Sequence, residues 1–305
     1  MIVNTTIPYT SDILENTILS LTKAFPFIRK VTIGKSVLEL PIYCLVFGNG
    51  PKEVFYSGAF HANEWIVTPL LLKFIEDFCF AYTTNNSIHG QSALNIFNTR
   101  TFYIVPMVNP DGVNLVNNNI PDTSTAYMQA RKISSQYPNI SFPSAWKANI
   151  NGVDLNLQFP AGWENAKTIK YANGFNSFSP RDFVGLKPLT EPEALAIYNL
   201  TLSHNFKLIL AYHTQGKEIY WQFRNYASSK AYFIGQKFAK VSGYTLADVP
   251  YESSFAGYKD WFLQEYGNPA YTIEAGIGQS PLSLSQFDKI YKDNLGILVY
   301  GATLS

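Results

Sequence analysis

The chain has 305 residues, of which 47% are hydrophobic, and its 23 basic and 22 acidic side chains give a formal net charge of +1. This length and composition allow one large α/β domain, or two small ones, with a substantial core. The balanced charge gives no electrostatic reason to expect nucleic acid or an anionic membrane as a partner. No apolar run approaches the ~20 residues that span a bilayer.

The N-terminal segment, residues 1–6, has neither a basic start nor an apolar stretch of the signal-peptide type. We therefore expect a soluble, cytoplasmic protein. The two cysteines, Cys44 and Cys79, each lie in an apolar segment. We expect them to be buried free thiols, not a disulfide or metal ligands.

Predicted strands alternate with predicted helices along the chain. An amphipathic helix begins at Ser11, and strands cover residues 31–34 and 42–46. A buried strand at residues 54–56 then leads into residues 58–65, Gly-Ala-Phe-His-Ala-Asn-Glu-Trp. The apolar spacing after this stretch predicts a helix.

His61 and Glu64 lie in this strand-to-helix turn. An imidazole and a carboxylate three residues apart can point at one spot, which suits a divalent metal such as zinc. Taken alone, His-x-x-Glu is a weak signal, because surface or capping pairs of this kind are common. A tetrahedral zinc site needs a third protein ligand from elsewhere in the chain.

The middle of the chain contains a long polar segment. Residues 101–108 form the next predicted strand, which ends in a strong turn signal, Asn-Pro-Asp-Gly, at 109–112. Residues 114–187 are rich in Asn, Ser, Pro and Gly, and we expect irregular structure that lines a substrate groove or decorates the surface. The next helix is predicted to begin with Thr190 as its N-cap and Glu193 as the capping-box partner.

Two later strands each end in a residue that is capable of chemistry. A buried strand at residues 206–212 is followed by His213, and a strand at residues 270–273 is followed by Glu274. The alternation of strands and helices predicts an α/β fold with a mixed, mostly parallel twisted sheet covered by helices on both faces. We expect a single domain over residues 1–305.

In open parallel sheets, ligands bind beyond the carboxyl ends of the strands. His61, His213 and Glu274 all follow strands there, so we expect them at one edge of the sheet. Each of them alone is more often a packed or solvated strand end. We predict that His61, Glu64 and His213 bind one zinc ion and leave an open position for water. Glu274 is then predicted to be the general base and not a ligand.

The order of these motifs resembles that of the zinc carboxypeptidase family of metallopeptidases, from about Tyr9 to the C-terminus. His-Ala-Asn-Glu at 61–64 is similar to the family's ligand pair, and Ala-Tyr-His at 211–213 to its third-ligand strand. Thr-Ile-Glu at 272–274 is similar to its catalytic strand, and Val-Asn-Pro-Asp-Gly at 108–112 matches a further motif. The resemblance implies a zinc carboxypeptidase-like fold and a peptide-bond hydrolase with one zinc ion.

The resemblance also implies further site residues. The family polarises the scissile carbonyl with an arginine, which the position after Asn-Pro-Asp-Gly matches to Arg131, with Lys132 as the competing choice. A tyrosine that closes over the substrate is matched to Tyr251, with Tyr258 as a rival. Asn156 is matched to the asparagine of an Asn-Arg pair that binds the terminal carboxylate of a peptide.

Leu157 stands where the arginine of that pair is found, and a leucine cannot form a bidentate pair with a carboxylate. Asn63 likewise replaces another arginine of many carboxypeptidases. Residues 154–164, Asp-Leu-Asn-Leu-Gln-Phe-Pro-Ala-Gly-Trp-Glu, resemble instead the branch of bacterial γ-D-glutamyl-L-diamino-acid endopeptidases.

This branch implies hydrolysis of the bond between D-glutamate and diaminopimelate or lysine in peptidoglycan stem peptides or muropeptides. We expect a catalytic domain without a cell-wall-binding module. Two alternatives stay open. One is a metallocarboxypeptidase with another carboxylate anchor, such as Arg181 or Arg224, and the other is a non-catalytic muropeptide-binding protein.

Overall fold

The computed structural model describes residues 1–305 and contains one eight-stranded sheet and a separate two-stranded hairpin. In chain order, the strands of the large sheet are β1 (Arg29–Lys35), β2 (Pro41–Gly48), β3 (Lys52–Gly58), β6 (Arg100–Val105), β7 (Phe206–His213), β8 (Glu218–Tyr220), β9 (Thr245–Ala247) and β10 (Ala270–Glu274). The hairpin strands are β4 (Ser87–Ile88) and β5 (Gln91–Ser92).

Neighbouring strands in the large sheet follow the order β1-β2-β6-β3-β7-β10-β8-β9. Four of the seven neighbouring pairs are parallel, namely β6–β3, β3–β7, β7–β10 and β8–β9. The pairs β1–β2, β2–β6 and β10–β8 are antiparallel. The mixed, mostly parallel sheet that the alternation predicts is therefore confirmed.

Ten α-helices and four short 3-10 helices connect and cover the strands. The α-helices are α1 (Ser11–Ala24), α2 (Val67–Thr83), α3 (Ala93–Thr99), α4 (Pro110–Val116), α5 (Thr125–Ser134), α6 (Trp163–Ala172), α7 (Pro192–Leu202), α8 (Ser229–Ser242), α9 (Tyr258–Tyr266) and α10 (Phe287–Thr303). The 3-10 helices are η1 (Ala62–Glu64), η2 (Leu155–Leu157), η3 (Tyr251–Ser253) and η4 (Leu284–Gln286).

Each central strand contributes to two apolar layers, because successive side chains of a strand point to opposite faces. In β3, Val54 and Tyr56 pack in one layer and Phe55 packs in the other. The first layer also takes in the apolar sides of α1, α2 and α10, and the second those of α7 and α9. Helices therefore cover both faces of the sheet, as predicted. Both cysteines, Cys44 and Cys79, are buried free thiols, as predicted.

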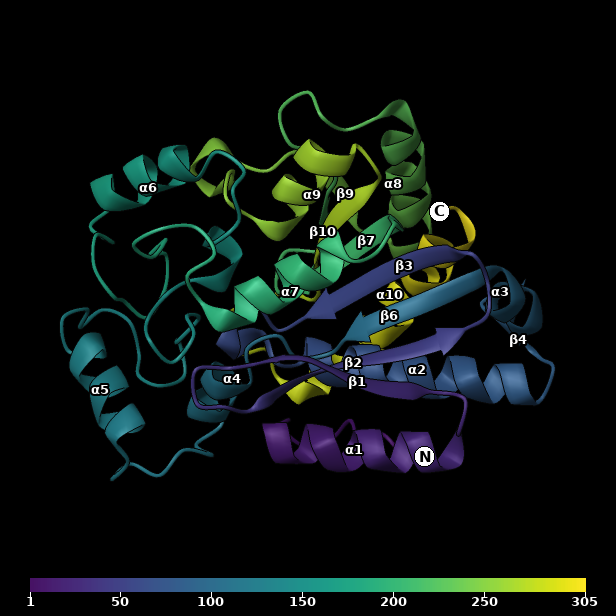
Figure 1. Ribbon diagram of the computed structural model, residues 1–305, viewed down its shortest axis with the longest axis horizontal. Coiled ribbons are helices and arrows are strands. Elements are labelled where there is room, and N and C mark those ends of the chain that lie inside the picture. Colours follow the sequence, from purple (N-terminus) through teal and green to yellow (C-terminus); the bar gives the residue numbers. More distant parts are fainter.

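The irregular segment that carries α5 and α6 lies beyond one edge of the sheet. In Figure 1 the arrowheads of β3 and β6 point toward this segment, which occupies the left of the view. The carboxyl ends of the central parallel strands therefore face the long polar part of the chain. This arrangement places strand-end residues and irregular chain around a common space.

Helix α7 begins later than the sequence pattern suggests. It starts at Pro192 and has no side-chain cap. The hydroxyl of Thr190 instead donates to Gln158 Oε1 at 3.1 Å. Glu193 is fully buried and accepts a bond from Val37 N at 3.3 Å. The predicted capping box was wrong, because tertiary contacts engage both of its side chains.

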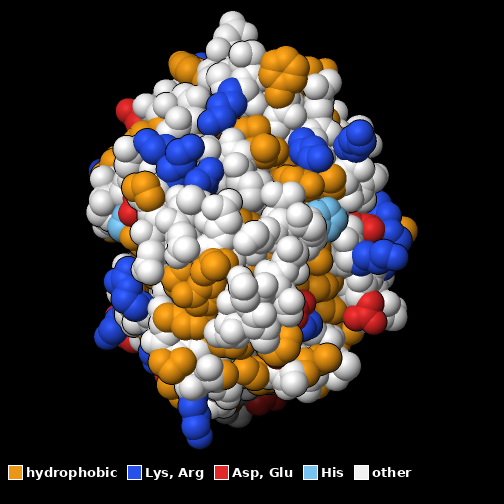
Figure 2. All heavy atoms as spheres, turned by 90° about the vertical axis from the view of Figure 1, so that its right-hand side faces the viewer, with side chains coloured by type: hydrophobic (Ala, Val, Ile, Leu, Met, Phe, Trp, Pro, Cys, Tyr) orange, Lys and Arg blue, Asp and Glu red, His pale blue; other side chains and the backbone are white.

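The face on the right-hand side of Figure 1 carries its Lys and Arg side chains in small, separate groups among apolar and neutral ones (Figure 2). That face has no continuous basic band of the kind that tracks nucleic-acid phosphates. None of the helices combines the length and the apolar character that crossing a bilayer requires.

Candidate metal centre and active site

Three potential metal ligands converge beyond the ends of β3 and β7. His61 follows β3, Glu64 closes η1, and His213 is the last residue of β7. Their ligand atoms lie within 4.8 Å of one another. His213 Nδ1 lies 3.2 Å from His61 Nδ1 and 2.9 Å from Glu64 Oε2. Two imidazoles and a carboxylate are the donor set of a catalytic zinc site with three protein ligands.

The second ring nitrogen of His61 supports this interpretation. His61 Nε2 lies 3.1 Å from Asp154 Oδ1, and a bond donated there leaves the lone pair of Nδ1 for a metal. Metal-binding histidines usually donate their other N–H to a carboxylate or a carbonyl. Burial alone would raise the pKa of Asp154, but His61 and Lys147 hold that pKa well below its ordinary value. The residues therefore fit one zinc ion.

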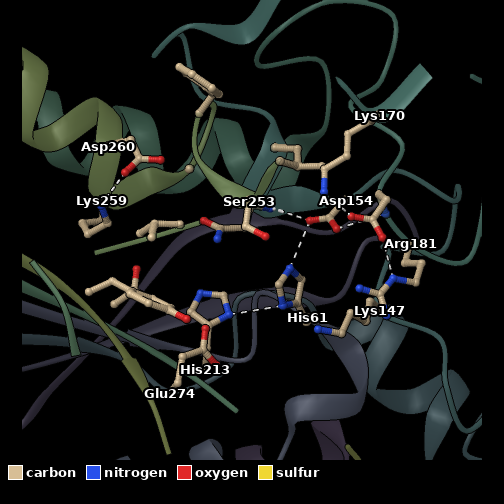
Figure 3. A pocket seen from close by; sticks show the side chains of 18 residues that line it. His61, Lys147, Asp154, Lys170, Arg181, His213, Ser253, Lys259, Asp260 and Glu274 are labelled. Atoms are coloured by element: carbon tan, nitrogen blue, oxygen red, sulfur yellow. Dashed lines mark hydrogen bonds and ion pairs between the residues drawn. The ribbon is translucent and has the colours of Figure 1, made fainter. Parts of the chain in front are cut away.

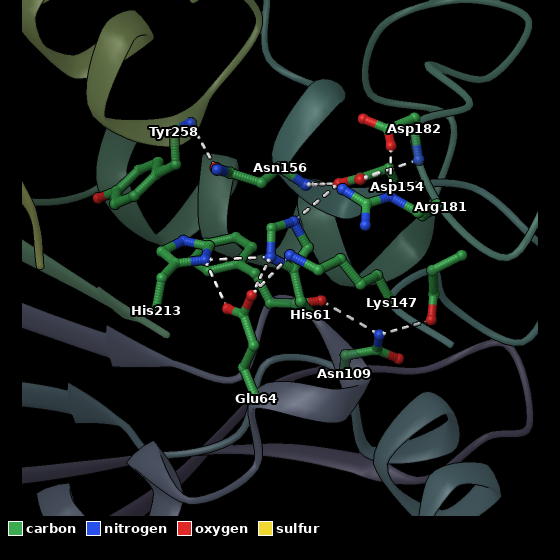
Figure 4. A network of polar contacts seen from close by, with 12 residues as sticks. His61, Glu64, Asn109, Lys147, Asp154, Asn156, Arg181, Asp182, His213 and Tyr258 are labelled. Carbon is green, nitrogen blue, oxygen red and sulfur yellow. Dashed lines mark hydrogen bonds and ion pairs between the residues drawn. The ribbon is translucent and has the colours of Figure 1, made fainter. Parts of the chain in front are cut away.

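The turn that carries His61 is held by the Asn-Pro-Asp-Gly motif. Ala59 adopts a left-handed conformation with φ 54° as the chain leaves β3. The backbone N–H groups of Val108 and Asn109 donate to the carbonyls of Gly58 and Ala59 at 3.0 and 3.1 Å. The Asn109 side chain also donates to the carbonyl of the residue before His61 at 3.1 Å. In Figure 4 the Asn109 side chain lies next to His61, and a dashed line marks its contact to the backbone there.

Glu274 ends β10 and is paired in register with His213 on the neighbouring parallel strand. Glu274 lines a cavity together with His61 and His213, but it is not one of the three converging ligands. Burial, followed by the nearby negative charge of Glu64, raises the pKa of Glu274 to about 8. A carboxyl group with a raised pKa beside a metal centre has the chemistry of a general base.

His61, His213 and Glu274 line one cavity, whose wall is formed by 18 residues, only four of them hydrophobic. Segments from the long polar region contribute to its wall, which confirms the expectation that this region lines a groove. Figure 3 shows Arg181 and Lys147 at one end, Lys259 and Asp260 at the other, and the two histidines between them. The charged side chains of the lining, besides His61, His213 and Glu274, are Lys147, Asp154, Lys170, Arg181, Asp182, Lys259 and Asp260.

The structure places Arg131 away from this cavity, which contradicts its expected position in the site. Arg131 lies on α5 with an exposed side chain and does not line the cavity. The cation beside the metal ligands is Lys147, whose Nζ donates to Glu64 Oε1 at 2.9 Å. Burial lowers the pKa of Lys147, but the charge of Glu64 outweighs this effect and the pKa lies above its ordinary value. Lys147 is therefore positively charged.

Sequence reasoning missed Lys147 and the structural reason for its position. Its carbonyl accepts a bond from Ala62 N at 2.9 Å, and its own N–H donates to Pro180 O at 2.8 Å. Trp146, which is 1% exposed, anchors the preceding position in the core. A tryptophan in an otherwise polar segment was the signal that this part of the irregular chain is packed and positioned.

Asn156 lines the cavity, as expected for a substrate-binding residue. Its Oδ1 accepts a bond from Tyr258 N at 3.1 Å, which orients the side-chain amide. Leu157 also lines the cavity and is 7% exposed. The position implied for a carboxylate-binding arginine therefore faces the cavity as an aliphatic side chain.

The two candidate tyrosines lie in different environments. Tyr251 is 62% exposed, and its ring packs edge-on against Phe255 with a centroid distance of 5.2 Å. It lines a separate hollow, together with Arg224, and does not line the main cavity. Tyr258 is fully buried, and its hydroxyl lies 2.9 Å from Thr201 Oγ1. Tyr258 is therefore a core residue and cannot close over a substrate.

A second hollow, with an empty volume of about 830 Å³, shares Lys147 and Arg181 with the main cavity. Its lining also includes Asn63 and Thr214, which neighbour the metal ligands in the chain. The second hollow therefore adjoins the main cavity at Lys147 and Arg181.

Comparisons with known proteins agree with this site. The family profile described as zinc carboxypeptidase matches residues 14–296. Gamma-D-glutamyl-L-diamino acid endopeptidase 1 of Lysinibacillus sphaericus is 44% identical over 296 residues, which cover 97% of this chain and 72% of the relative. The uncharacterized protein YqgT of Bacillus subtilis (strain 168) is 39% identical over 292 residues, covering 95% of this chain and 76% of the relative.

Solved structures share the fold at low sequence identity. Carboxypeptidase A from Helicoverpa armigera has a TM-score of 0.72 and 18% identity, and the match covers 99% of this chain and 74% of that chain. Murein-tripeptide amidase MpaA from Escherichia coli O157 has a TM-score of 0.55 and 18% identity, with 89% and 91% covered. The carboxypeptidase-like architecture that the sequence motifs imply is confirmed.

Proposed function

The chain belongs to the zinc carboxypeptidase family, and we propose that it hydrolyses the amide bond between the γ-carboxyl of D-glutamate and the L-centre of a diamino acid in peptidoglycan stem peptides. The relative from Lysinibacillus sphaericus bears the name of that activity. The observation in this chain that carries the proposal is Leu157 in the cavity wall, next to Asn156.

A leucine at this position disfavours an exopeptidase, because a terminal carboxylate needs a charged, bidentate partner. An endopeptidase instead needs room for substrate on both sides of the scissile bond. The two hollows that meet at Lys147 and Arg181 provide such room. Both features favour cleavage within a stem peptide.

The catalytic roles follow from the placement of the side chains. His61, Glu64 and His213 would hold one zinc ion, which when bound supplies a Lewis acid and lowers the pKa of water. Glu274 takes a proton from the attacking water and passes it to the leaving nitrogen as the C–N bond breaks. Lys147, in place of Arg131, offers its positive charge to the developing oxyanion.

The polar wall positions the acyl half of the substrate. D-Glutamate linked through its γ-carboxyl keeps a free α-carboxylate. Arg181 and Lys147 are the cations common to both hollows, and the bond from Arg181 Nε to Asp182 Oδ2 at 2.5 Å leaves the terminal guanidinium nitrogens for an anion. Asn156 adds an oriented amide to the same wall. Tyr251 lies in the neighbouring hollow, which shares Val249 and Phe255 with the main cavity, and it is the residue proposed to cover the bound substrate.

A second candidate activity is favoured by the same arginine. Arg181 lines the cavity and has the charge to bind a C-terminal carboxylate, so a metallocarboxypeptidase with a different anchor also fits. Arg224 does not serve this role, because it lies in the separate hollow beside Tyr251.

Mass spectrometry of products from a defined muropeptide set, incubated with the zinc-loaded protein, separates these activities. The proposed enzyme releases L-Ala-D-Glu from L-Ala-γ-D-Glu-diamino acid, with or without a terminal D-Ala. A carboxypeptidase instead removes the terminal D-Ala as a single residue from the extended peptide, and it also acts on ordinary peptides. Stoichiometric zinc with no turnover of any muropeptide would leave the non-catalytic muropeptide-binding protein. The cytoplasmic location expected from the N-terminal residues stays a prediction.

The Glu274→Gln variant tests the mechanism. The amide cannot accept the water's proton, so hydrolysis is expected to disappear while the three ligands keep their zinc. Metal analysis of the purified variant is the control. Full activity in a zinc-loaded Glu274→Gln protein would contradict the role of this carboxylate.

A further inference from the structure

A buried ion pair lies in the cavity wall at the end opposite Arg181 and Lys147 (Figure 3). Lys259 Nζ lies 2.5 Å from Asp260 Oδ1 and donates to Gln222 O at 2.7 Å. The side chains of Lys259 and Asp260 are only 4% and 6% exposed, yet both line the cavity. An ammonium group has three donors, so one remains after these two contacts.

The fold gains little from a lysine at this point. Lys259 is the second residue of α9, where the helix dipole favours an anion and disfavours a cation. Asp260, in the same first turn, suits the helix start without a lysine beside it. Lysines are rarely buried to this degree, and an apolar pair in such a place is often as stable as a buried ion pair. A role in binding accounts for a cation in this wall better than a role in folding.

Three other charged side chains of the cavity, Lys170, Arg181 and Asp154, form contacts that do not involve Lys259 or Asp260. Lys170 pairs with Asp182 at 2.7 Å, and Arg181 pairs with the same carboxylate. Asp154 accepts from His61. Lys259 and Asp260 are therefore a distinct pair of opposite charges, next to each other, at the end of the cavity away from the acyl-side cations.

Adjacent opposite charges complement a zwitterion. The side chain of meso-diaminopimelate ends in one carbon that bears both a carboxylate and an ammonium group. The side chain of lysine ends in an ammonium group alone, which could pair with Asp260 but offers no carboxylate to Lys259. We propose that Lys259 and Asp260 bind the distal carboxylate and ammonium of diaminopimelate, respectively, and thereby select it over lysine.

This assignment rests on the proposed function and names its diamino acid. It also sets the direction of the substrate. The D-glutamyl half lies toward Arg181 and Lys147, the scissile bond lies at the metal ligands, and the diamino acid extends toward α9.

Three tripeptides test the inference on the zinc-loaded enzyme. They are L-Ala-γ-D-Glu-meso-diaminopimelate, the same peptide with the distal carboxylate converted to a carboxamide, and the peptide with L-lysine. We expect kcat/KM for the first peptide to exceed that for the other two by about 10²-fold. The other two peptides offer no carboxylate to the buried ammonium group of Lys259. The carboxamide differs from the parent only at the group that Lys259 is proposed to bind.

The variant Lys259→Met keeps the length of the side chain and removes its charge. It is expected to lose most of the activity on the diaminopimelate peptide and to keep its activity on the lysine peptide, so that the preference disappears. Lys73→Met is a matched control, because Lys73 is also partly buried and paired, with Asp77 at 2.5 Å, but does not line the cavity. That control should leave all three rates unchanged.

The outcomes separate the inference from the function on which it rests. Equal hydrolysis of the three tripeptides by the wild-type enzyme overturns the selectivity and leaves the proposed function standing. No hydrolysis of any of them overturns the proposed function itself. If Lys259→Met does not fold, the ratio of the wild-type kcat/KM values for the carboxylate and carboxamide peptides still tests the inference.

Discussion

Replacing Lys147 by methionine tests which cation polarises the scissile carbonyl. Lys147 Nζ lies 2.9 Å from Glu64 Oε1, and its side chain is 19% exposed. Methionine keeps the length and most of the volume and removes the charge. Loss of one preorganised donor to a developing oxyanion typically costs about 10²- to 10³-fold in kcat, or roughly 3–4 kcal/mol. We expect a loss of this size in kcat/KM for Lys147→Met, with the zinc content unchanged.

The assay compares steady-state hydrolysis of the diaminopimelate tripeptide by Lys147→Met and Arg131→Met, with zinc measured in each protein. Arg131→Met is the matched control, because that side chain is exposed on α5 and does not line the cavity. It should behave as wild type. Lys147→Arg should recover part of the rate, because it restores the charge in a different shape. The reasoning is refuted if Arg131→Met loses activity while zinc-loaded Lys147→Met retains it.

Three further predictions concern the metal and the buried acids. Removing the metal with a chelator should abolish hydrolysis, and stoichiometric zinc should restore it. Asp154→Asn should weaken zinc binding by about 10- to 100-fold in a competition titration, because His61 loses its orienting carboxylate. Burial raises the pKa of Glu193 from 4.5 to about 8. Between these values the folded state holds a proton that the unfolded state has lost, so wild-type stability falls as pH rises, by up to about 1.4 kcal/mol per pH unit from this residue. Glu193→Gln should remove this contribution to the pH dependence of stability. In urea unfolding at pH 5 and pH 8, the free energy of unfolding of the variant should rise relative to that of wild type at the higher pH.

The positions of His61, His213 and Glu274 could be predicted from the sequence because each stands at or just after the end of a regular strand. A short, mostly apolar run indicates a buried strand, and a polar residue at its carboxyl end is expected at the sheet edge where ligands bind. His213 and Glu274 illustrate this, because the register of β7 and β10 pairs them directly. The alternation of strands and helices then places β3, with His61 beyond it, at the same edge. Local pattern and topology together were sufficient here.

The cation of the site was not accessible by the same route. Lys147 lies in chain without periodicity, and long-range backbone bonds to Ala62 and Pro180 hold it in place. Counting forward from Asn-Pro-Asp-Gly reaches Arg131 first, which lies on helix α5 with an exposed side chain and does not line the cavity. A position that depends on such pairing has no local signature. The capping box at Thr190 fails for a related reason, because Gln158 and Val37, distant in sequence, take its two side chains.

Strand ends and irregular segments therefore contribute different residues to the proposed activity. His61, His213 and Glu274 stand at strand ends, and these ends are set by the sheet of a fold that the chain shares with a carboxypeptidase A structure of 18% identity. The substrate contacts come instead from segments that lie outside the strands, such as η2 with Leu157 and the first turn of α9 with Lys259. Substitutions there change what is bound without disturbing the metal centre. We therefore expect Leu157 and Lys259, which both line the cavity, to be positions that determine which substrate this chain accepts.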